Sequence, residues 1–517
     1  MMKETDLKKT KRIYWASGIV SICGIIFEVL FGALGSYILG DGVKQYTLTI
    51  SLFLTGMGIG AFLSERVIKQ LIATFIRVEF AVALIGGFSA LFMFGVSAYL
   101  PPGTNSLYLY TVILIVGMLT GLELPILIRK AHEIGVAVHK STARVLFADY
   151  AGGLVGGILF ILWLRPEFGL VKTAFIVAIA NAGVALWTVY GFRDEIKHTR
   201  GYSVVGWLIM ICLVAGALFG GKMAFTFEQK LYKDPIIFSK QTQYQHIIMT
   251  KEQGDYRLYL DGNLQFSSVD EARYHEVLVH PTMALAKHPH KVLILGGGDG
   301  LAAREVLKYK EVRHITLVDI DPEMTHLARN YPLLVKLNKG SMLSKRVTVH
   351  NKDAFQYLKR HQGLYDVVIV DLPDPNNISL NKVYTKEFYE LIRNHLAPGG
   401  AMVVQATSPV FATKVYWTIN KTVESAGLYT GNLHVNVPSF GDWGFVLAAR
   451  HPFKIKGWSI PVKTRFLKSG MIPALTHFGK DADSKIYVNG KRIKFKPNTL
   501  VHPDLIRMYQ KAWRYYH

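Results

Sequence analysis

One acid in a glycine-rich turn, Asp299, carries the most specific chemistry in this sequence. The apolar run 292–295 leads into GGGDG at 296–300, and a helical pattern follows. A strand, a glycine-rich turn and a helix start together form a nucleotide-type binding loop, because glycines let a ligand approach the backbone closely. A carboxylate on this loop repels anionic groups. The expected ligand is therefore cationic at this point and is not a pyrophosphate.

Further aspartates lie at or near the ends of predicted strands. VDID places Asp319 where a carboxylate commonly accepts hydrogen bonds from both ribose hydroxyls, and NKDA places Asp353 near the expected nucleobase. VDLPDP brings Asp371 and Asp374 together around a proline bend, where paired carboxylates suit a polycation and supply a general base. Taken singly, strand-end aspartates often only cap helices. The prediction therefore depends on their joint order and spacing.

Strand-like and helical patterns alternate from residue 291 onward, which predicts βαβ units and a parallel sheet that binds ligands at the carboxyl ends of its strands. The expected strands are 291–296, 314–320, 347–350, 365–371 and 401–405, followed by two that complete the sheet at about 427–437 and 443–449. The expected helices are 301–309, 322–330, 384–396 and 412–426. We assign this α/β domain to residues 286–450.

Two smaller regions flank the α/β domain. Residues 226–285 contain alternating patterns that predict a small antiparallel β region. Residues 451–517 form a basic C-terminal extension. Within it, 486–495 predicts a hairpin with an Asn489-Gly490 turn, and 502–516 predicts a helix.

The first part of the chain, residues 1–225, is a series of apolar runs long enough to cross a bilayer, which takes about 20 residues per helix. We count seven, at 14–39, 46–63, 78–100, 106–128, 145–164, 170–192 and 203–222. The first run is too long for a cleaved signal peptide, and further runs follow at once. We therefore predict a multi-span α-helical membrane domain whose partner is the lipid bilayer.

The formal net charge of +22 does not indicate nucleic-acid binding, because of where the basic residues lie. Many lie in loops between the apolar runs, and residues 450–517 contain 15 Lys and Arg against three acids. No aromatic and basic recognition module accompanies them. Basic segments of a membrane protein most simply face anionic headgroups, so we expect no nucleic-acid partner.

Ionisable residues within the apolar runs need an explanation, since charge is costly inside a bilayer. Glu28, Glu123 and Asp149 fit two interpretations, pairing with basic residues near helix ends or a path for cations. Both cysteines, Cys23 and Cys212, also lie in apolar runs. We expect them to pack as small residues, and the soluble part has no cysteines for a zinc cluster.

Five motifs follow one another in the soluble part. They are LDGNLQ at 260–265, DEARYHE at 270–276 with His280-Pro281, then GGGDG, VDID and DLPDP. Over roughly 235–450 the sequence resembles the polyamine aminopropyltransferases, the spermidine synthase family, and the apolar part resembles the N-terminal extension of membrane-spanning bacterial members. The resemblance implies a Rossmann-like, methyltransferase-type fold. It also implies aminopropyl transfer from decarboxylated S-adenosylmethionine to putrescine, giving spermidine and methylthioadenosine.

The resemblance implies a role for each matched residue. Asp371 is the expected base, Asp374 holds the acceptor with it, and Tyr274 and His275 position the amines. The remaining substrate-binding positions are Asp299 at the donor amine, Gln245 and Asp319 at the ribose, Asp353 at the adenine, and Ala354 and Gln265. Without the resemblance, Tyr274 and His275 would be taken as a packing tyrosine and a surface histidine, and Gln245 as an ordinary strand residue.

The implied reaction agrees with the residues themselves. The donor lacks the methionine carboxylate and keeps a cationic amine, which Asp299 attracts while it repels ordinary S-adenosylmethionine. The acceptor amine must be neutral to attack, although alkyl amines have pKa values of about 10.4, so a carboxylate has to accept the proton. We expect the donor as co-substrate, no permanently bound cofactor and no metal. The family implies a homodimer or homotetramer.

Two alternatives stay open, a methyltransferase that uses intact S-adenosylmethionine and a polyamine transporter or sensor that binds without turnover. The sequence also departs from the family around the acceptor. Leu372-Pro373 separate the two aspartates, an altered segment follows at 376–379, and Phe440 stands where a tyrosine is common. The acceptor is therefore putrescine or another polyamine.

The side of the membrane is a conflict within the sequence. An N-terminus inside the cell also places the basic loops 64–77, 129–144 and 193–202 inside, as the positive-inside rule prefers. Seven spans then leave the catalytic domain outside. A cytosolic donor and a basic tail suited to the anionic inner leaflet favour the opposite result. We expect a multi-pass cell-membrane protein whose catalytic domain is cytoplasmic, against the seven-span count.

Overall fold

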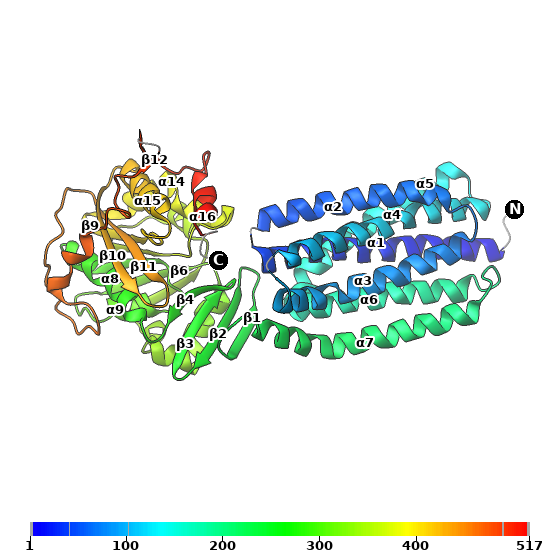
Figure 1. Ribbon diagram of the computed structural model, residues 1–517, viewed down its shortest axis with the longest axis horizontal. Helices are drawn as coiled ribbons and strands as arrows, with labels where there is room; N and C mark the ends of the chain where they lie inside the picture. The colour runs from blue at the N-terminus through cyan, green and yellow to red at the C-terminus, as the bar shows by residue number, and fades with distance from the viewer. Residues whose placement is uncertain (1–3, 41, 102, 489–490, 514–517) are drawn as a thin grey trace. The chain divides into compact units, whose positions relative to one another are not determined.

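The structure is a computed structural model that describes residues 4–40, 42–101, 103–488 and 491–513. The chain folds into two compact units, Met1–Pro235 and Ile236–His517. The first is a bundle of long helices, and the second is an α/β unit (Figure 1). The expected boundary at 225 falls inside a helix that ends at Gln229, so the helical unit is longer than predicted.

Seven long helices match the seven predicted apolar runs. They are α1 (Glu4–Leu39), α2 (Gly42–Leu63), α3 (Leu71–Tyr99), α4 (Thr104–Glu133), α5 (Val138–Leu159), α6 (Arg165–Gly191) and α7 (Thr199–Gln229). In the described part of the chain, six helical stretches are long and apolar enough to cross a membrane. One of these, Val138–Gly191, contains both α5 and α6, because the helical segment Phe160–Leu164 joins them without a break. Gly169 (φ 68°, ψ −175°) is a kink within α6.

Contacts between the helices show the direction in which each one runs. Helix α5 runs parallel to α1, as the contacts Ser17–Val145 and Ser21–Asp149 show. Helix α6 runs antiparallel to α1, with contacts Arg12–Trp187 and Cys23–Val177. Helix α7 in turn runs antiparallel to α6, with contacts Gly206–Leu186 and Gly216–Phe175. Helices α1, α5 and α7 therefore share a direction. The chain leaves α7 at the end of the bundle opposite its N-terminus (Figure 1).

Basic loops gather at the N-terminal end of the bundle. The Glu195 carboxylate, in the loop after α6, lies 2.6 Å from the amines of both Lys9 on α1 and Lys130 on α4. Arg129 donates hydrogen bonds to the backbone oxygens of Ser64 and Val67 in the loop after α2. The predicted basic loops thus lie together with the N-terminus, and the α/β unit follows from the other end.

The bundle packs through small residues where helices meet closely. A Cβ on Gly60 of α2 would lie 1.9 Å from the Met118 backbone oxygen of α4, and one on Gly121 would lie 2.1 Å from that of Met57. Glycines at these positions let the two backbones touch, as small residues do between apolar helices.

Buried acids lie inside the bundle. Glu123 is 4% exposed, and Glu79, which the sequence analysis did not single out, is fully buried. Within the described residues, neither forms an ion pair with a basic side chain. Glu28 and Asp149 are half-buried. The interpretation as pairs with Lys or Arg therefore does not account for Glu123.

The α/β unit begins with a four-stranded antiparallel sheet in the order β1-β2-β3-β4. Its strands are β1 (Ile236–Gln241), β2 (His246–Glu252), β3 (Asp255–Leu260) and β4 (Asn263–Ser267). The expected region 226–285 therefore contains less sheet than predicted. Its last part is helix α8 (Glu271–Leu285), which packs against the large sheet.

The large sheet has seven strands in the order β10-β11-β9-β8-β5-β6-β7. They are β5 (Lys291–Gly296), β6 (His314–Asp319), β7 (Val347–Asn351), β8 (Tyr365–Asp371), β9 (Leu396–Gln405), β10 (Tyr429–Val437) and β11 (Gly441–Ala449). Strands β5 to β9 pair in parallel, and β11 and β10 add antiparallel strands. The strand order reverses between β5 and β8, which is where such sheets bind ligands.

Helices cover both faces of this sheet. They are α8, α9 (Leu301–Val306), α10 (Pro322–Asn330), α11 (Pro332–Leu337), α12 (Ala354–Arg360), α13 (Ile378–Asn381), α14 (Lys386–His395) and α15 (Thr413–Ser425). Alternate residues of β5 enter different cores: Val292 and Ile294 pack with α8 and α9, and Leu293 and Leu295 with α14 and α15. This two-residue period confirms the predicted α/β layers.

The C-terminal extension belongs to the same compact unit as the large sheet. Leu467, Ile472 and Leu505 are buried in its two cores. Short helical turns lie at Ser469–Met471 and Ala474–Thr476, and α16 (Asp504–Trp513) is the predicted C-terminal helix. The predicted hairpin is β12 (Tyr487–Val488) and β13 (Lys491–Arg492), and its expected turn at 489–490 lies outside the described residues.

Candidate functional site

The glycine-rich turn after β5 lies against the end of β8. Gly296 pairs with Asp371 in the sheet and has a φ of 84°. A Cβ on Gly296 would lie 2.1 Å from the Asp371 backbone oxygen, so no side chain fits there. The backbone N–H of Gly297 donates to that same oxygen at 3.0 Å. The turn that carries Asp299 is thereby fixed beside Asp371, where the strand order reverses.

Helix α8 presents Tyr274 to Asp371. The tyrosine hydroxyl donates a hydrogen bond of 2.7 Å to the carboxylate, and the tyrosine ring packs against Phe440 and Phe445. Burial raises the pKa of Asp371, while His275 and the bond from Tyr274 oppose that rise. The structure thus joins the two predicted residues directly.

A buried ion pair holds α8 against α9. Arg304 donates to both carboxylate oxygens of Glu271, at 2.9 and 2.8 Å. The same carboxylate lies 2.9 Å from Nδ1 of His275, which is 2% exposed and is not a surface histidine. Burial lowers the pKa of His275, which favours its neutral form. Neither Glu271 nor Arg304 was predicted as a site residue. Glu271 lies within DEARYHE, but its partner Arg304 is on another helix, and no sequence pattern relates the two positions.

Asp299 is half-buried in the turn, and one of its oxygens accepts the Leu301 backbone N–H at 2.8 Å. Burial raises the pKa of Asp299, His275 opposes that rise, and the negative charge of Asp371 adds to it. The two carboxylates are therefore close enough to repel one another. A cation between them would stabilise both charged forms.

Asp319, at the end of β6, lies under the same turn. Its two oxygens accept the backbone N–H groups of Gly298 at 3.0 Å and Asp321 at 2.9 Å. A Cβ on Gly298 would lie 2.4 Å from this carboxylate, so the glycine is required for the approach. Burial raises the pKa of Asp319 to about 7.

Gln245 contacts a different aspartate from the one expected beside it. It precedes β2 in the turn after β1, and its side-chain amide donates to Asp321 at 2.9 Å. The Thr242 hydroxyl donates to the same carboxylate oxygen at 2.9 Å. Asp321 is fully buried and links the small sheet to the ligand edge of the large one. Asp321 is the last residue of VDID, so the motif itself marks this position.

Asp353 caps helix α12, as strand-end aspartates often do. Its carboxylate accepts the Gln356 backbone N–H at 2.9 Å and pairs with Lys382, and Ala354 begins the helix. A cavity of about 260 Å³ adjoins this position. It is lined by Lys352, Asp353, Gln356, Tyr357, Arg360 and His361.

Asp374 lies on the loop after β8, where the sequence departs from the family. Gln405, at the end of β9, donates to its carboxylate at 3.1 Å, and burial raises the pKa of Asp374. The Tyr384 hydroxyl donates to the backbone oxygens of Leu372 and Pro373, both at 3.1 Å. The Tyr384 side chain therefore holds the altered loop through the loop's backbone oxygens. Gln405 could have been found from the sequence as a polar residue at a strand end, whereas no pattern in the sequence marks Tyr384.

Gln265 does not join this group. It lies on β4, and its side-chain amide donates to the Asn263 backbone oxygen at 3.1 Å within the same hairpin. The structure therefore connects Tyr274, His275, Asp299 and Asp371, places Asp319 below them and Asp374 beside them, and leaves Gln265 in the small sheet.

One cluster in this unit has metal-ligand residue types. Ligand atoms of Glu276, His280 and Glu305 lie within 4.8 Å of one another. Existing partners occupy them: His280 lies 2.9 Å from the Tyr309 hydroxyl and 3.0 Å from Glu305, and Glu276 accepts backbone N–H groups of the C-terminal extension. We interpret this cluster as structural.

The strand order and the acidic carboxyl edge define a Rossmann-like α/β domain, the class that binds its ligands at the carboxyl ends of its strands. Residues 271–455 match the family described as "Spermine/spermidine synthase domain". The chain is 60% identical to a polyamine aminopropyltransferase of Oceanobacillus iheyensis over all of both chains. It is 40% identical to one of Leptospira interrogans, covering 97% of this chain and 98% of the relative.

The chain belongs to the polyamine aminopropyltransferase family, and it is an enzyme that transfers aminopropyl groups. The comparisons therefore favour the predicted activity over a methyltransferase or a binding protein without turnover. Among solved structures, a spermidine synthase in complex with the transition state analogue AdoDATO is 25% identical with a TM-score of 0.45. The match covers 47% of this chain and 85% of the spermidine synthase chain.

Replacing Tyr274 with phenylalanine tests the bond to Asp371. The hydroxyl stabilises the charged carboxylate, so its loss raises the pKa of Asp371 and leaves less base at low pH. We expect kcat/KM to fall about 10-fold, and the acid limb of its pH profile to move to higher pH. Tyr389→Phe is the control, because that buried hydroxyl has no hydrogen-bond partner among the described residues. A Tyr274→Phe profile that overlays the wild type would show that Tyr274 does not tune Asp371.

Proposed function

We propose that the enzyme transfers the aminopropyl group of decarboxylated S-adenosylmethionine to putrescine, giving spermidine and methylthioadenosine. The observation that supports this most is the pair of carboxylates where the sheet order reverses, with Asp299 in the turn after β5 and Asp371 at the end of the adjacent β8. Two acids that destabilise one another need a cation, and both substrates are cationic amines.

Asp299 selects the donor in this proposal. The decarboxylated donor presents an ammonium group where the parent compound also carries a carboxylate. Asp299 attracts the ammonium and repels the carboxylate, so a single charge separates two otherwise similar nucleosides. One oxygen of Asp299 accepts the Leu301 backbone N–H, and this hydrogen bond holds the carboxylate in a fixed direction.

The nucleoside part of the donor lies along the strand ends. Asp319 accepts hydrogen bonds from the ribose hydroxyls, and Gln245 supports this side through Asp321. Asp353, Ala354 and the adjoining cavity take the adenine. Gln265 remains a proposed substrate contact that the family resemblance alone supports.

Asp371 is the base. The acceptor nitrogen bonds to the carbon beside the sulfonium, the carbon–sulfur bond breaks, and its electron pair leaves with sulfur as a neutral thioether. The proton released from nitrogen passes to Asp371, while Tyr274 and His275 position the amines and Asp374 binds the far end of the acceptor. The sulfonium is already a good leaving group, so this step calls for neither a metal nor a bound cofactor. A homodimer or homotetramer is the assembly we propose, from the family resemblance.

Isothermal titration tests the donor. The wild type should prefer decarboxylated S-adenosylmethionine to the intact compound, and Asp299→Asn should weaken its binding by about 10- to 100-fold, the value of a charge-assisted hydrogen bond. Methylthioadenosine lacks the amine and is the matched control, so its Kd should change little. Tighter binding of intact S-adenosylmethionine by the wild type would contradict this donor.

Single-turnover kinetics test the base. Asp371→Asn cannot accept the proton, so we expect turnover to fall by about 100-fold or more while methylthioadenosine still binds. A variant with wild-type turnover would exclude Asp371 as the base. Loss of nucleoside binding together with turnover would assign Asp371 to donor binding instead.

We also propose that the helical unit spans the cell membrane and that the catalytic unit is cytoplasmic. Two physical requirements conflict here. The bundle carries its basic loops at the end opposite the one from which α7 continues into the catalytic unit, and the positive-inside rule would place the basic end in the cytoplasm. The reaction, however, needs a charged nucleoside donor that does not cross a bilayer unaided. Donor supply is indispensable, whereas the charge rule is a bias, so we favour the cytoplasmic side.

Labelling of intact cells with an impermeant maleimide tests this location. In a Cys212→Ser background, Ile68→Cys marks the basic end and Val269→Cys marks the catalytic unit, since these side chains are 76% and 73% exposed. We expect Ile68→Cys to react on intact cells and Val269→Cys only after permeabilisation. The reverse pattern would place the catalytic unit outside, and equal reactivity at both sites would contradict a bundle with opposite ends.

A further inference from the structure

Three side chains meet at one buried carboxylate in the first turn of α8, that of Glu271, which is 1% exposed. Arg304 on α9 donates to both of its oxygens, and Nδ1 of His275 lies 2.9 Å from Oε2. Arg465, in the C-terminal extension, donates to Oε1. Two guanidinium groups around one carboxylate hold it in a single orientation.

The hydrogen bonds of His275 define which ring nitrogen carries its proton. Nδ1 lies 2.9 Å from the backbone oxygen of Glu271 as well as 2.9 Å from its Oε2. A backbone oxygen can only accept a hydrogen bond, so Nδ1 is the donor. Burial lowers the pKa of His275 and favours the neutral ring, in which the second nitrogen is an acceptor. Nε2 therefore carries a lone pair.

This lone pair is left for a ligand. Among the described residues, Nε2 of His275 has no hydrogen-bond partner. The centroid of the His275 ring lies 5.0 Å from that of Tyr274, whose hydroxyl binds Asp371, and the charges of Asp299 and Asp371 both act on His275. An acceptor nitrogen beside two acids suits an ammonium group, whereas an N–H at the same place would repel it.

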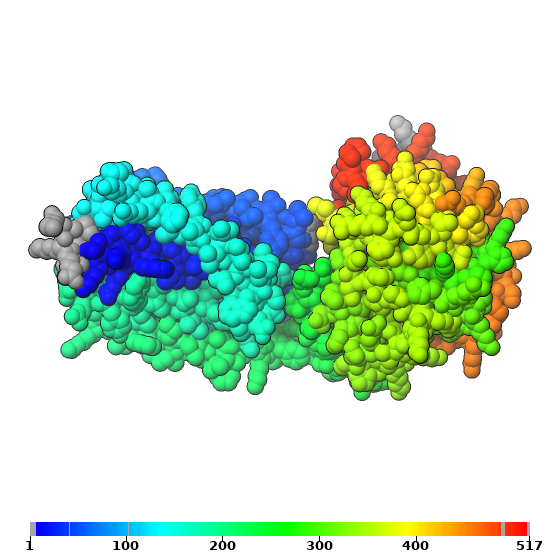
Figure 2. Space-filling model, turned by 180° about the vertical axis from the view of Figure 1, so that it is seen from behind, coloured from blue at the N-terminus to red at the C-terminus, as the bar shows by residue number. Residues whose placement is uncertain are grey.

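Arg465 belongs to a segment whose backbone is fixed to α8. The Glu276 carboxylate accepts three successive backbone N–H groups, from Arg465 at 2.6 Å, Phe466 at 2.9 Å and Leu467 at 2.8 Å. Leu467 is 1% exposed in the sheet core. Figure 2 shows orange residues of the extension at the surface beside green residues of the same unit. The region that matches the synthase family ends at 455, so Arg465 lies outside it.

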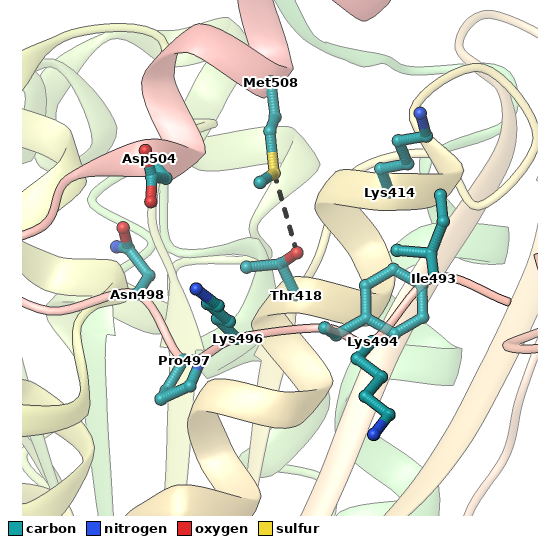
Figure 3. A pocket seen from close by; sticks show the side chains of 10 residues that line it. Lys414, Thr418, Ile493, Lys494, Lys496, Pro497, Asn498, Asp504 and Met508 are labelled. Carbon is teal, nitrogen blue, oxygen red and sulfur yellow. Dashed lines mark hydrogen bonds between the residues drawn. The ribbon is translucent and has the colours of Figure 1, made fainter. Parts of the chain in front are cut away.

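The last part of the extension is also packed into this unit. Asn498 is 1% exposed, and its side-chain amide donates to the Tyr384 backbone oxygen at 3.0 Å. Met508 on α16 lies 3.7 Å from the Thr418 hydroxyl on α15, beside a cavity of about 140 Å³ (Figure 3). The extension is therefore a built part of the catalytic unit, and Arg465 has a defined place in it.

We propose that Glu271 is a positioning residue that fixes His275 as the tautomer with its proton on Nδ1. Arg304 and Arg465 hold the Glu271 carboxylate in place for this bond. Nε2 of His275 then accepts a hydrogen bond from the ammonium group of the donor, beside Asp299. An ammonium group has three N–H donors, so one carboxylate alone does not satisfy it. The inference rests on the proposed role of Asp299 in donor binding.

The direct test is ¹⁵N NMR of the full-length protein labelled at histidine, with the His275 signals assigned through His275→Gln. We expect a protonated Nδ1 and an unprotonated Nε2. Decarboxylated S-adenosylmethionine should move the Nε2 signal, whereas methylthioadenosine, which has no amine, should leave it in place. The signals of His280, whose nitrogens already bind Tyr309 and Glu305, should respond to neither compound. A proton on Nε2, or an Nε2 signal that the donor does not move, would overturn the proposal.

Glu271→Gln tests the positioning role. An amide has one acceptor oxygen and cannot receive both guanidinium groups and Nδ1, so we expect a share of His275 to carry its proton on Nε2. The Kd of the decarboxylated donor should rise about 10-fold, and that of methylthioadenosine should not change. Arg465→Gln leaves the buried pair of Glu271 and Arg304 intact and should raise the donor Kd about 3-fold. It keeps the proposal testable if Glu271→Gln does not fold.

Glu305→Gln is the matched control. It removes another buried carboxylate that binds Arg304 but does not contact His275. Its His275 signals and its donor Kd should equal those of the wild type. A Glu305→Gln variant that changes the His275 tautomer as much as Glu271→Gln does would show a general effect of lost buried charge, and the specific role of Glu271 would be rejected.

Asp299→Asn separates this inference from the proposed function. If Asp299→Asn leaves the Kd of the decarboxylated donor unchanged, the proposed donor site is wrong. If Asp299→Asn weakens donor binding while Glu271→Gln changes neither the His275 signals nor the donor Kd, the donor site stands and only the further inference fails.

Discussion

Negative charge concentrated at one edge of a parallel sheet is the constraint on which this catalytic unit depends. Burial raises the pKa of Asp299, Asp319, Asp371 and Asp374, so each carboxylate lies where its charged form is disfavoured. Glycines let the turn after β5 approach these acids within van der Waals distance. In the proposed function, cationic amines stabilise the charged forms of these carboxylates, which couples substrate recognition to the arrangement of the fold.

The charges that stabilise the scaffold are kept apart from those left for the substrates. Arg304 donates four hydrogen bonds, to both oxygens of Glu271, to Glu305 and to the Leu337 backbone oxygen, so this buried cation is paired with two carboxylates. Because Arg304 is engaged by Glu271 and Glu305, the α8 side chain that bonds Asp371 is the neutral hydroxyl of Tyr274. A free cation beside Asp371 would compete with the amine that the site has to bind.

The parts of the site that follow from local pattern could be predicted. Strands buried on both faces are continuous apolar runs, so β5 and β8 begin and end where the sequence indicates, and a residue such as Asp371 at a strand end is placed by the sheet itself. Contacts between distant segments leave no such pattern. Glu271 with Arg304 and Asp374 with Gln405 join parts of the chain that no periodicity relates. The domain boundary expected at 225 falls inside α7, because this helix continues after its apolar run ends.

The two halves of the site are therefore secured in different ways. On the donor side, the glycine turn and Asp319 are held by neighbouring backbone N–H groups, within a few residues of the strands that carry them. On the proposed acceptor side, Asp374 accepts a hydrogen bond from Gln405 on another strand, and Asn498 of the C-terminal extension donates to the Tyr384 backbone oxygen. A change at Asn498 can thus alter the acceptor pocket while the donor loop stays intact. The departures from the family around Leu372, Pro373 and Phe440 all fall on this second side, where long-range contacts rather than a local motif determine the shape.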